Sequence, residues 1–222
     1  MKIKYLGHSS FKITGKSDSG DNVTVVIDPF DPKYVGISFA QQEADIVTIS
    51  HQHQDHNFTD KIKPKNEKLF IADAPGEYEV ENLRIYGLGG WHDDKEGKER
   101  GRNTSYIYDF QEARIAHLGD LGHELTSDQV EELENIEILM IPIGGTYTIN
   151  PKQAMDIIEE LEPLIVLPMH YKTDKHNASF NDLATLNDFL ALNGAKVETM
   201  DELVIKDKSN IPNTLTVINL AF

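Results

Sequence analysis

The chain has 222 residues, and its 37 Asp and Glu against 21 Lys and Arg give a formal net charge of −16. A surface this acidic repels the phosphate backbones of nucleic acids and anionic lipids. We therefore expect neither a nucleic-acid partner nor a membrane partner. Cysteine is absent, which excludes disulfides, thiolate metal ligands and a cysteine nucleophile. Any bound metal must therefore be held by histidine and carboxylate side chains.

The first half of the chain is predicted to form short strands separated by turns. These stretches are rich in Val, Ile, Phe and Tyr and are bounded by Gly, Pro, Asn or Asp, as strands in a sheet usually are. A Gly/Ser/Asp cluster at Gly15–Asn22 predicts a hairpin loop. The predicted strands are Lys2–Leu6, Phe11–Thr14, Val23–Ile27, Asp45–Ser50, Lys68–Ala72, Leu83–Tyr86, Thr104–Tyr108 and Ala113–His117.

The second half alternates predicted helices and strands. Thr126 and Gln129 form a capping box for a helix to about Leu133, and Asn150-Pro151 opens a helix to about Leu161. Ser179 with Asp182 predicts a third helix that Gly194 closes. Strands are predicted at Ile138–Ile143, with Pro142 near its end, at Leu164–Leu167, near Val197, at Leu203–Ile205 and at Thr214–Leu220.

This order of elements predicts the α/β class: two mixed sheets packed together with helices outside, an αββα sandwich. Hydrophobic residues make up 39% of the chain, enough for a sizeable core. Since no repeat, low-complexity tract or linker interrupts it, we expect one domain over residues 1–222. The start lacks the apolar run of a signal peptide and no stretch predicts a membrane span, so we expect a cytoplasmic protein.

The stretch SHQHQDHN places His51, His53, Asp55 and His56 directly after the predicted strand Asp45–Ser50. Side chains just beyond a strand end are held rigidly and stay open to solvent. His51 and His53, two residues apart, can share a side, while Asp55 and His56 can turn toward a second ion. The spacing therefore favours two metals over one, and the alternative is a solvated polar loop.

Further ligand-type residues also follow predicted strands or glycines. Asp120, in HLGDLGH, and His170, in VLPMH, come just past apolar strands, and His92 follows a glycine pair in GGWHDD. Each alone has an ordinary explanation, a turn-forming Asp or a hydrogen-bonded His. Together they match a metal site assembled along one sheet edge.

With these residues in view, the chain resembles the metallo-β-lactamase fold superfamily of metal-dependent hydrolases. The spacing of His51, His53, Asp55 and His56 carries the resemblance, together with Gly-Asp at Asp120 and the strand-end His170. The segments YLGHSSFKI, IDPFDP, PGEYEV, RGRNT and PMHYKT look like an uncharacterised branch related to the ascorbate-phosphate lactonases. The resemblance extends over nearly the whole chain and implies the same αββα sandwich.

The resemblance also implies a ligand set. His51, His53 and His92 would bind a first metal, Asp55, His56 and His170 would bind a second, and Asp120 would bridge the two. His117 competes with His92 for the third histidine of the first site. His53 stands where flavodiiron proteins have a carboxylate, and an imidazole there suits Zn²⁺, with Mn²⁺, Fe²⁺ or Ni²⁺ as alternatives.

The activity this implies is hydrolysis of a small ester, lactone or phosphoester by hydroxide bound to two divalent metal ions. Asp55 is the candidate catalytic residue that takes a proton from the water or steers it. Four further residues are candidates for supporting a ligand or touching substrate: His8, Asp28, Asn103 and Lys172.

Two alternative functions stay open: a phosphodiesterase or nuclease of the same superfamily, or a non-catalytic metal-binding or regulatory protein. The short acidic chain counts against the nuclease, and the full ligand set counts against lost chemistry. No G-x-S-x-G elbow, phosphate-loop motif or dinucleotide fingerprint occurs in the sequence, so serine hydrolase, ATPase and dehydrogenase functions have no support. The substrate, the native metal and the oligomeric state are not predicted.

Overall fold

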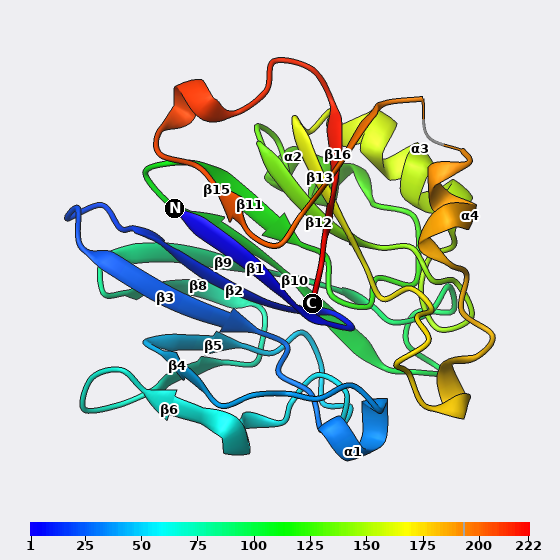
Figure 1. Ribbon diagram of the computed structural model, residues 1–222, viewed down its shortest axis with the longest axis horizontal. Helices are drawn as coiled ribbons and strands as arrows, with labels where there is room; N and C mark the ends of the chain where they lie inside the picture. The colour runs from blue at the N-terminus through cyan, green and yellow to red at the C-terminus, as the bar shows by residue number, and fades with distance from the viewer. Residues whose placement is uncertain (193) are drawn as a thin grey trace.

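The structure is a computed structural model that describes residues 1–192 and 194–222 (Figure 1). One of its two main sheets has six strands. Their order across the sheet is β15-β1-β2-β3-β5-β7. β1 to β3 form an antiparallel meander, and β5 and β7 continue parallel to β3. The bounds are β1 Lys2–Gly7, β2 Ser10–Lys16, β3 Asn22–Ile27, β5 Ile46–Thr48, β7 Phe70–Ala72 and β15 Leu203–Val204.

The second main sheet has eight strands in the order β14-β16-β13-β12-β11-β10-β9-β8. Its half from β11 to β14 is parallel, and β8 to β11 are antiparallel neighbours. The bounds are β8 Gly76–Val80, β9 Leu83–Trp91, β10 Arg102–Asp109, β11 Arg114–His117, β12 Ile138–Pro142, β13 Ile165–Met169, β14 Lys196–Met200 and β16 Thr216–Leu220. β4 (Gln42–Ala44) and β6 (Ile62–Pro64) form a separate pair.

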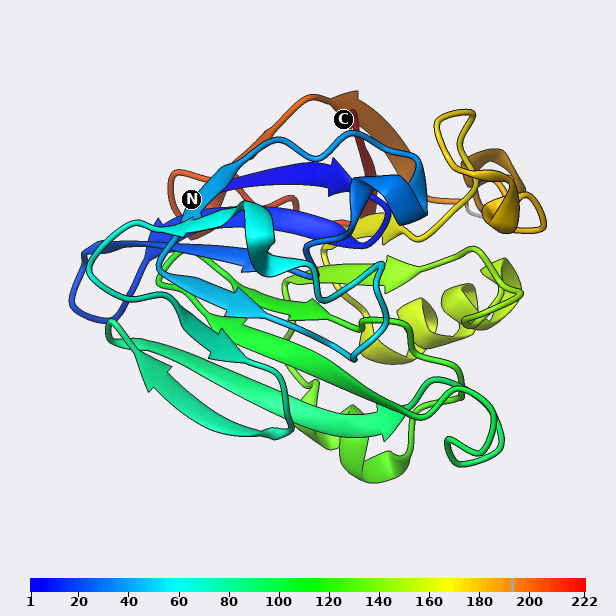
Figure 2. The same ribbon diagram turned by 90° about the horizontal axis from the view of Figure 1, so that it is seen from below.

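The two sheets lie face to face, as Figure 2 shows from below, and the pleat of the strands divides their apolar side chains between two clusters. In β3, Val25 and Ile27 point into the main core between the sheets. Val26 points the other way, into a smaller cluster with Phe30 and Phe180. The continuous apolar runs of these strands are therefore explained by burial on both faces.

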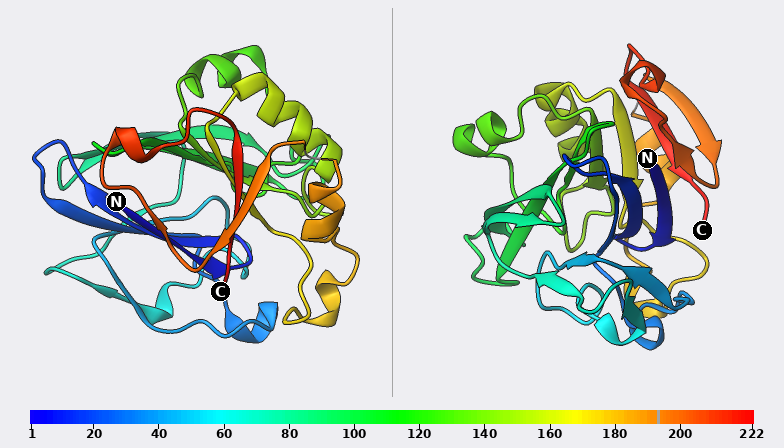
Figure 3. Two further views of the ribbon diagram at one scale, coloured as in Figure 1. Left: turned by 45° about the horizontal axis from the view of Figure 1, so that its top comes forward. Right: turned by 90° about the vertical axis from the view of Figure 1, so that its left-hand side faces the viewer.

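The helices lie outside the sheets (Figures 1 and 3). α2 (Ser127–Glu132) and α3 (Pro151–Leu161) cover the eight-stranded sheet, and α4 (Leu186–Leu190) contacts α3. α1 (Pro32–Val35) is a single turn near the six-stranded sheet. The predicted αββα sandwich is confirmed, and the cover on the six-stranded side is mostly irregular chain. Within the described residues, no helix has the length and apolarity needed to cross a membrane.

Most of the predicted elements are confirmed, including the capping box at Thr126 and the N-cap at Asn150, which the structure extends to a capping box with Gln153. The third helix is wrong: residues 178–180 form a short 3₁₀ turn, and α4 begins only after Thr185, whose own capping box with Asp188 opens it. Ser179 has no capping role because the chain there turns through Asn177 instead. Of the predicted range, residue 193 lies outside the described residues. Three strands without a clear pattern were missed: β4, β6 and β8.

The strand directions bring several strand ends to one edge of the sandwich. β1, β3 and β5 all run the same way, and so do β9, β11, β12 and β13. Parallel strands end at the same edge, where sites in such sheets usually form. The residues that follow these ends are His8 after β1, Asp28 after β3, His51 after β5, His92 after β9, Asp120 after β11 and His170 after β13.

Candidate metal centre

Three histidines form a first cluster at this edge. The ring centroids of His51 and His53 lie 4.5 Å apart, those of His51 and His92 also 4.5 Å, and those of His53 and His92 5.1 Å. One ring nitrogen from each lies within 4.8 Å of the others. His51 and His92 are buried, whereas His53 is exposed at the rim. The structure thus places His92, and not His117, beside the histidines of the loop.

A second cluster lies beside the first and is fully buried. It brings together a carboxylate oxygen of Asp55 and ring nitrogens of His56, His170 and His8, all within 4.8 Å of one another. The rings of His51 and His56 are 4.1 Å apart and join the two clusters. His8 therefore stands among the residues expected around a second ion.

The carboxylate of Asp120 lies between the two clusters. Its Oδ2 is 3.4 Å from Nε2 of His92 in the first cluster, and 3.2 Å from Nε2 of both His56 and His170 in the second. The side chain is only 2% exposed. A single carboxylate oxygen thus faces nitrogens of both clusters.

Unpaired polar atoms concentrate in this centre. Eight buried side-chain atoms among the described residues have no hydrogen-bond partner, and six belong to candidate ligands. They are Nε2 of His51 and His56, Nδ1 of His92, both ring nitrogens of His170, and Oδ1 of Asp120. Nε2 of His56 and of His170 approach Asp120 as ion pairs without hydrogen-bond alignment. An unpaired buried polar atom costs about 1–3 kcal/mol, so this concentration indicates a ligand.

The far sides of two of these rings, those of His51 and His56, are anchored, which aims their unpaired Nε2 atoms inward. Asp28 contacts Nδ1 of His56 at 2.9 Å and accepts hydrogen bonds from Ser50 N and Oγ at 2.7 and 2.6 Å. Ser50 Oγ in turn lies 2.9 Å from Nδ1 of His51. Carboxylates and hydroxyls behind metal-binding histidines commonly fix the ring and its tautomer in this way. Asp28 supports both clusters.

Asn103 supports Asp120 from the backbone side. Its Oδ1 accepts a hydrogen bond from Asp120 N at 2.8 Å, and its Nδ2 donates to Leu118 O at 2.9 Å. A Cβ on Gly119, which has a φ of 57°, would lie 2.3 Å from Asn103 Oδ1. The tight turn into Asp120 thus depends on glycine at this position.

The backbone is strained at three of the residues that form the centre. His8, Asp28 and His170 have positive φ values of 56°, 43° and 51°. Such angles cost a non-glycine residue roughly 1–3 kcal/mol and persist only where surrounding structure imposes them. Each of the three directly follows a strand, so the strain directs its side chain toward the centre.

The pKa values of His51 and His56, whose rings join the two clusters, shift in opposite directions. Burial, and next the charge of His56, lowers the pKa of His51 well below its ordinary value, and burial is also the main cause that lowers the pKa of His92. For His56, burial opposes protonation, but the charges of Asp120 and Asp55 raise its pKa well above the ordinary value. For Asp120, burial acts in the opposite sense to the charges of His170 and His56, which hold its pKa well below its usual range.

His8 connects Asp55 to a second histidine, His176. Nε2 of His8 lies 3.2 Å from Asp55 Oδ2, and Nδ1 of His8 lies 3.2 Å from His176 Nε2. Burial, with the charge of His170, lowers the pKa of His8 to about 4, and burial with the charge of His8 lowers that of His176 to about 3, so both rings are neutral at pH 7.

The tautomers of this pair follow from the backbone. Thr173 N donates to Nδ1 of His176 at 3.2 Å. His176 must then carry its proton on Nε2 and donate to His8, which donates from Nε2 to Asp55. His176 is half-buried and belongs to this series of contacts from Asp55 through His8. No local sequence pattern predicts this contact, because His176 lies in an irregular loop.

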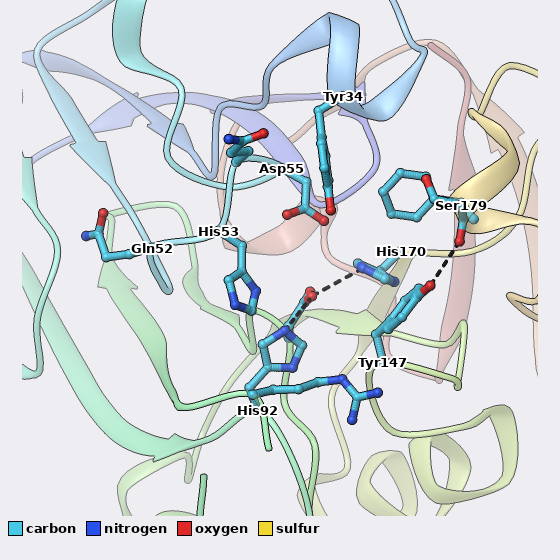
Figure 4. Close-up of a pocket in the computed structure, with 12 residues that line it drawn as sticks. Tyr34, Gln52, His53, Asp55, His92, Tyr147, His170 and Ser179 are labelled. Carbon is cyan, nitrogen blue, oxygen red and sulfur yellow. Dashed lines mark hydrogen bonds and ion pairs between the residues drawn. The ribbon is translucent and has the colours of Figure 1, made fainter. Parts of the chain in front are cut away.

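The centre forms the floor of a cavity of about 520 Å³ (Figure 4). In the figure, His53, His92, His170 and Asp55 point toward one another, with Tyr34 and Tyr147 on the walls. No sequence pattern marks the remaining lining residues as functional, although Gln52 and Gln54 lie within SHQHQDHN and Arg100 lies within RGRNT. These lining residues are Tyr34, Gln52, Gln54, Arg100, Tyr147, Ser179 and Phe180.

Two other candidates for substrate contact lie elsewhere. Lys172 donates from Nζ to Asn181 O at 2.7 Å and does not line the cavity. Asn103 is turned to the backbone around Asp120, so its role is support.

His117 is buried, and both of its ring nitrogens contact backbone, at Ser9 O and Gly119 N. His117 is therefore a core residue, and His92 takes the position beside His51 for which the two competed.

With this fold and centre described, comparison with known proteins identifies the class. The chain belongs to the beta-lactamase superfamily, because the model of its domain matches residues 2–170. A solved structure from Thermotoga maritima, described as a candidate zinc-dependent hydrolase of the metallo-beta-lactamase superfamily, is 32% identical. It covers 99% of both chains with a TM-score of 0.77.

Curated relatives agree with this family. A protein from Methanopyrus kandleri named as a metal-dependent hydrolase is 29% identical over 201 residues, which cover 78% of this chain and 85% of that protein. A metallo hydrolase from Ignicoccus hospitalis shares the fold, with 23% identity, a TM-score of 0.55, and coverage of 86% of this chain and 91% of its own. The kinship with ascorbate-phosphate lactonases stays a prediction.

Proposed function

We propose that this protein is a metal-dependent hydrolase that holds two divalent ions and cleaves a small ester or lactone. The observation that carries the proposal is the position of Asp120, whose Oδ2 lies within 3.4 Å of imidazole nitrogens from both clusters. Relatives named as metal-dependent hydrolases support the reaction class.

The residues fit two ions. The first would be held by His51, His53 and His92, and the second by Asp55, His56 and His170, with Asp120 shared. Imidazoles and carboxylates, with no thiolate in the chain, form a donor set suited to Zn²⁺ and also acceptable to Mn²⁺, Fe²⁺ or Ni²⁺. The unpaired ring nitrogens of His51, His56 and His170 are the atoms that would coordinate such ions.

When bound, the ions supply Lewis-acid chemistry: they polarise the bond to be cleaved and lower the pKa of coordinated water to about 7. The chain's own residues position the reactants. Asp55 reaches the cavity with one side fixed by His8, so its carboxylate can steer the attacking water. Hydrolysis breaks the acyl C–O bond, and water supplies OH to the acid and H to the alcohol.

Asp28, Ser50 and Asn103 hold the ligands without touching substrate. Their hydrogen bonds to His56, His51 and the backbone of Asp120 fix ring directions before any ion arrives. Such preorganisation means that little reorganisation accompanies binding. We place His8 in the same group, since its hydrogen bond fixes Asp55.

The test combines metal analysis with a substrate panel. Purified protein should contain close to two divalent ions per chain and hydrolyse at least one chromogenic ester or lactone. Dialysis against a chelator should abolish turnover, and adding Zn²⁺ back should restore it. Full turnover in metal-free protein would refute the proposal.

The same panel separates the alternatives. Cleavage of bis(4-nitrophenyl) phosphate in preference to every ester would favour a phosphodiesterase. Two bound ions without turnover of any substrate would favour a metal-binding or regulatory protein. We rank these lower because the cavity opens directly onto both clusters, and because the chain's charge of −16 opposes nucleic acid.

A further inference from the structure

The cavity above the centre contains a cation that the hydrolytic reaction itself does not use. Among the residues that line it, all of which the structure describes, Arg100 is the one Lys or Arg. In a chain with a charge of −16, a basic side chain beside the centre creates a local preference for anions that the rest of the surface does not share.

The loop that carries Arg100 is tightly folded around Asp93, the residue after His92. Oδ1 of Asp93 accepts from Lys95 N and Gly97 N, both at 2.9 Å. Oδ2 accepts from Glu99 N at 3.0 Å and Arg100 N at 2.7 Å. These four hydrogen bonds to one carboxylate hold the segment in place without regular secondary structure. The position of Arg100 is therefore fixed relative to His92 by a few bonds of backbone.

The guanidinium is also held in place at its far end. It lies 5.5 Å from the centroid of the Tyr147 ring and donates from Nη2 to Thr146 O at 3.3 Å. Tyr147 is itself fixed, since its hydroxyl donates to Ser179 O at 2.9 Å, and its ring lies 6.5 Å from that of His170. One aromatic ring therefore contacts both the arginine and a candidate ligand.

Much of the donor capacity of Arg100 is unused. Within the described residues its side chain makes a single hydrogen bond, and 33% of it is exposed. Its ion pair with Glu99 is long, at 3.7 Å, and the other oxygen of Glu99 pairs with Lys95. A guanidinium presents a planar fork of N–H donors that matches the two oxygens of a carboxylate.

We infer that Arg100 is a specificity-determining residue that binds a carboxylate on the substrate, remote from the bond that is cleaved. This inference rests on the proposed function and adds the substrate class: an ester or lactone whose acyl part ends in a carboxylate. A carboxylate fits better than a phosphate dianion because no second basic side chain lines the cavity and Glu99 stands nearby. The ring of Tyr147 packs beside the spacer between the two groups.

The first experiment measures binding without turnover. Calorimetric titration of the metal-loaded protein with glutarate and with butyrate compares two carboxylic acids that differ by one terminal carboxylate. Wild type should bind glutarate roughly 10–100-fold more tightly than butyrate, since a hydrogen-bonded charge pair is worth that factor. In Arg100→Gln the two affinities should become equal.

Arg102→Gln is the matched control, because Arg102 lies two residues away, over Trp91, and does not line this cavity. It should keep the wild-type ratio, and Arg100→Lys should keep part of it. A glutarate preference that survives in Arg100→Gln would overturn the inference. So would the absence of any glutarate preference in wild type.

The second experiment separates this inference from the proposed function. The 4-nitrophenyl monoester of glutaric acid and 4-nitrophenyl butyrate should differ in kcat/KM by roughly 10–100-fold in wild type, and the difference should vanish in Arg100→Gln with the butyrate value unchanged. If neither ester is cleaved while the glutarate binding ratio depends on Arg100, the subsite stands and ester hydrolysis fails. Equal cleavage of both esters by both proteins supports hydrolysis and refutes the subsite.

Discussion

The two ligand clusters contain similar residues but differ in charge and depth. The first consists of three histidines, and His53 at its rim is exposed. The second is buried throughout and contains the carboxylate of Asp55, which His8 holds in place. A carboxylate adds attraction for a dication, and burial reduces screening of that attraction. The comparison teaches that the second cluster should hold its ion more tightly than the first.

The largest effect is expected at the residue that the two clusters share. Replacing Asp120 with Asn keeps the shape of the side chain but removes its charge, which faces nitrogens of both clusters. We expect both ions to be lost and hydrolysis to fall by more than the roughly 10–100-fold that loss of an outer hydrogen-bond partner costs. Metal analysis after dialysis measures this. Retention of both ions in Asp120→Asn would mean that the carboxylate does not bridge.

A pair of substitutions tests the difference between the clusters directly. His53→Ala should lose the first ion and keep the second, with little change in stability because the side chain is exposed. Asp55→Ala should weaken the second ion and leave the first cluster intact. Stepwise titration with a chelator, followed by metal analysis, gives the order of release. If the wild type releases its buried ion first, the proposed ranking is reversed.

His8→Asn sharpens the comparison within the second cluster. Asn tolerates the positive φ of 56° at this position, so the change removes the imidazole without adding backbone strain. Loss of the hydrogen bond to Asp55 should weaken the second ion by roughly 10–100-fold and leave the first unchanged. His123→Asn is a control outside both clusters. Equal weakening of both ions in His8→Asn would contradict a role specific to Asp55.

The smallest effect concerns His117, a buried histidine outside both clusters. Burial is the main cause that lowers its pKa, so below pH 6.5 the unfolded chain binds a proton that the folded protein does not. The contribution of His117 therefore makes the protein less stable as the pH is lowered from 6.5 to the pKa of the folded state. The decrease is at most about 1.4 kcal/mol for each pH unit. Urea unfolding between pH 7 and 5 should show a shallower decline for His117→Gln. Identical declines in the two proteins would exclude this contribution.

Local signals in the sequence were sufficient for most of the fold. The apolar strands of the core, the capping box at Thr126, the N-cap at Asn150 and the hairpin loop near Gly15 all depend on neighbouring residues, and the structure confirms them. The predicted start of the third helix was wrong because Ser179 is a residue type common at helix caps but lies in a loop held by contacts with Tyr147 and with Lys33 of α1. β4 and β6 are short and become strands by pairing with each other across about twenty residues of chain, and β8 becomes one by pairing with the next strand, β9, in a hairpin.

The sequence also predicted most residues of the candidate centre, because ligand-type side chains directly after apolar strands can be recognised without a structure. It left open whether His92 or His117 joined His51, and it did not include His176 or Arg100. Those depend on which way a strand-end side chain faces and on how a loop folds. His117 is the last residue of β11 and faces the core, whereas His92 lies one residue beyond β9 and faces the edge.

The amino-acid order by itself determined which residue types could bind metal, where strands would end, and that no thiolate could take part. Only the tertiary structure decided which of these residues meet, because the ligands come from two sheets whose strand ends share an edge only after the sheets have stacked. The cavity walls formed by Tyr34, Tyr147 and Arg100 were decided in the same way. Their contacts join segments far apart in the chain, and no local pattern records such contacts.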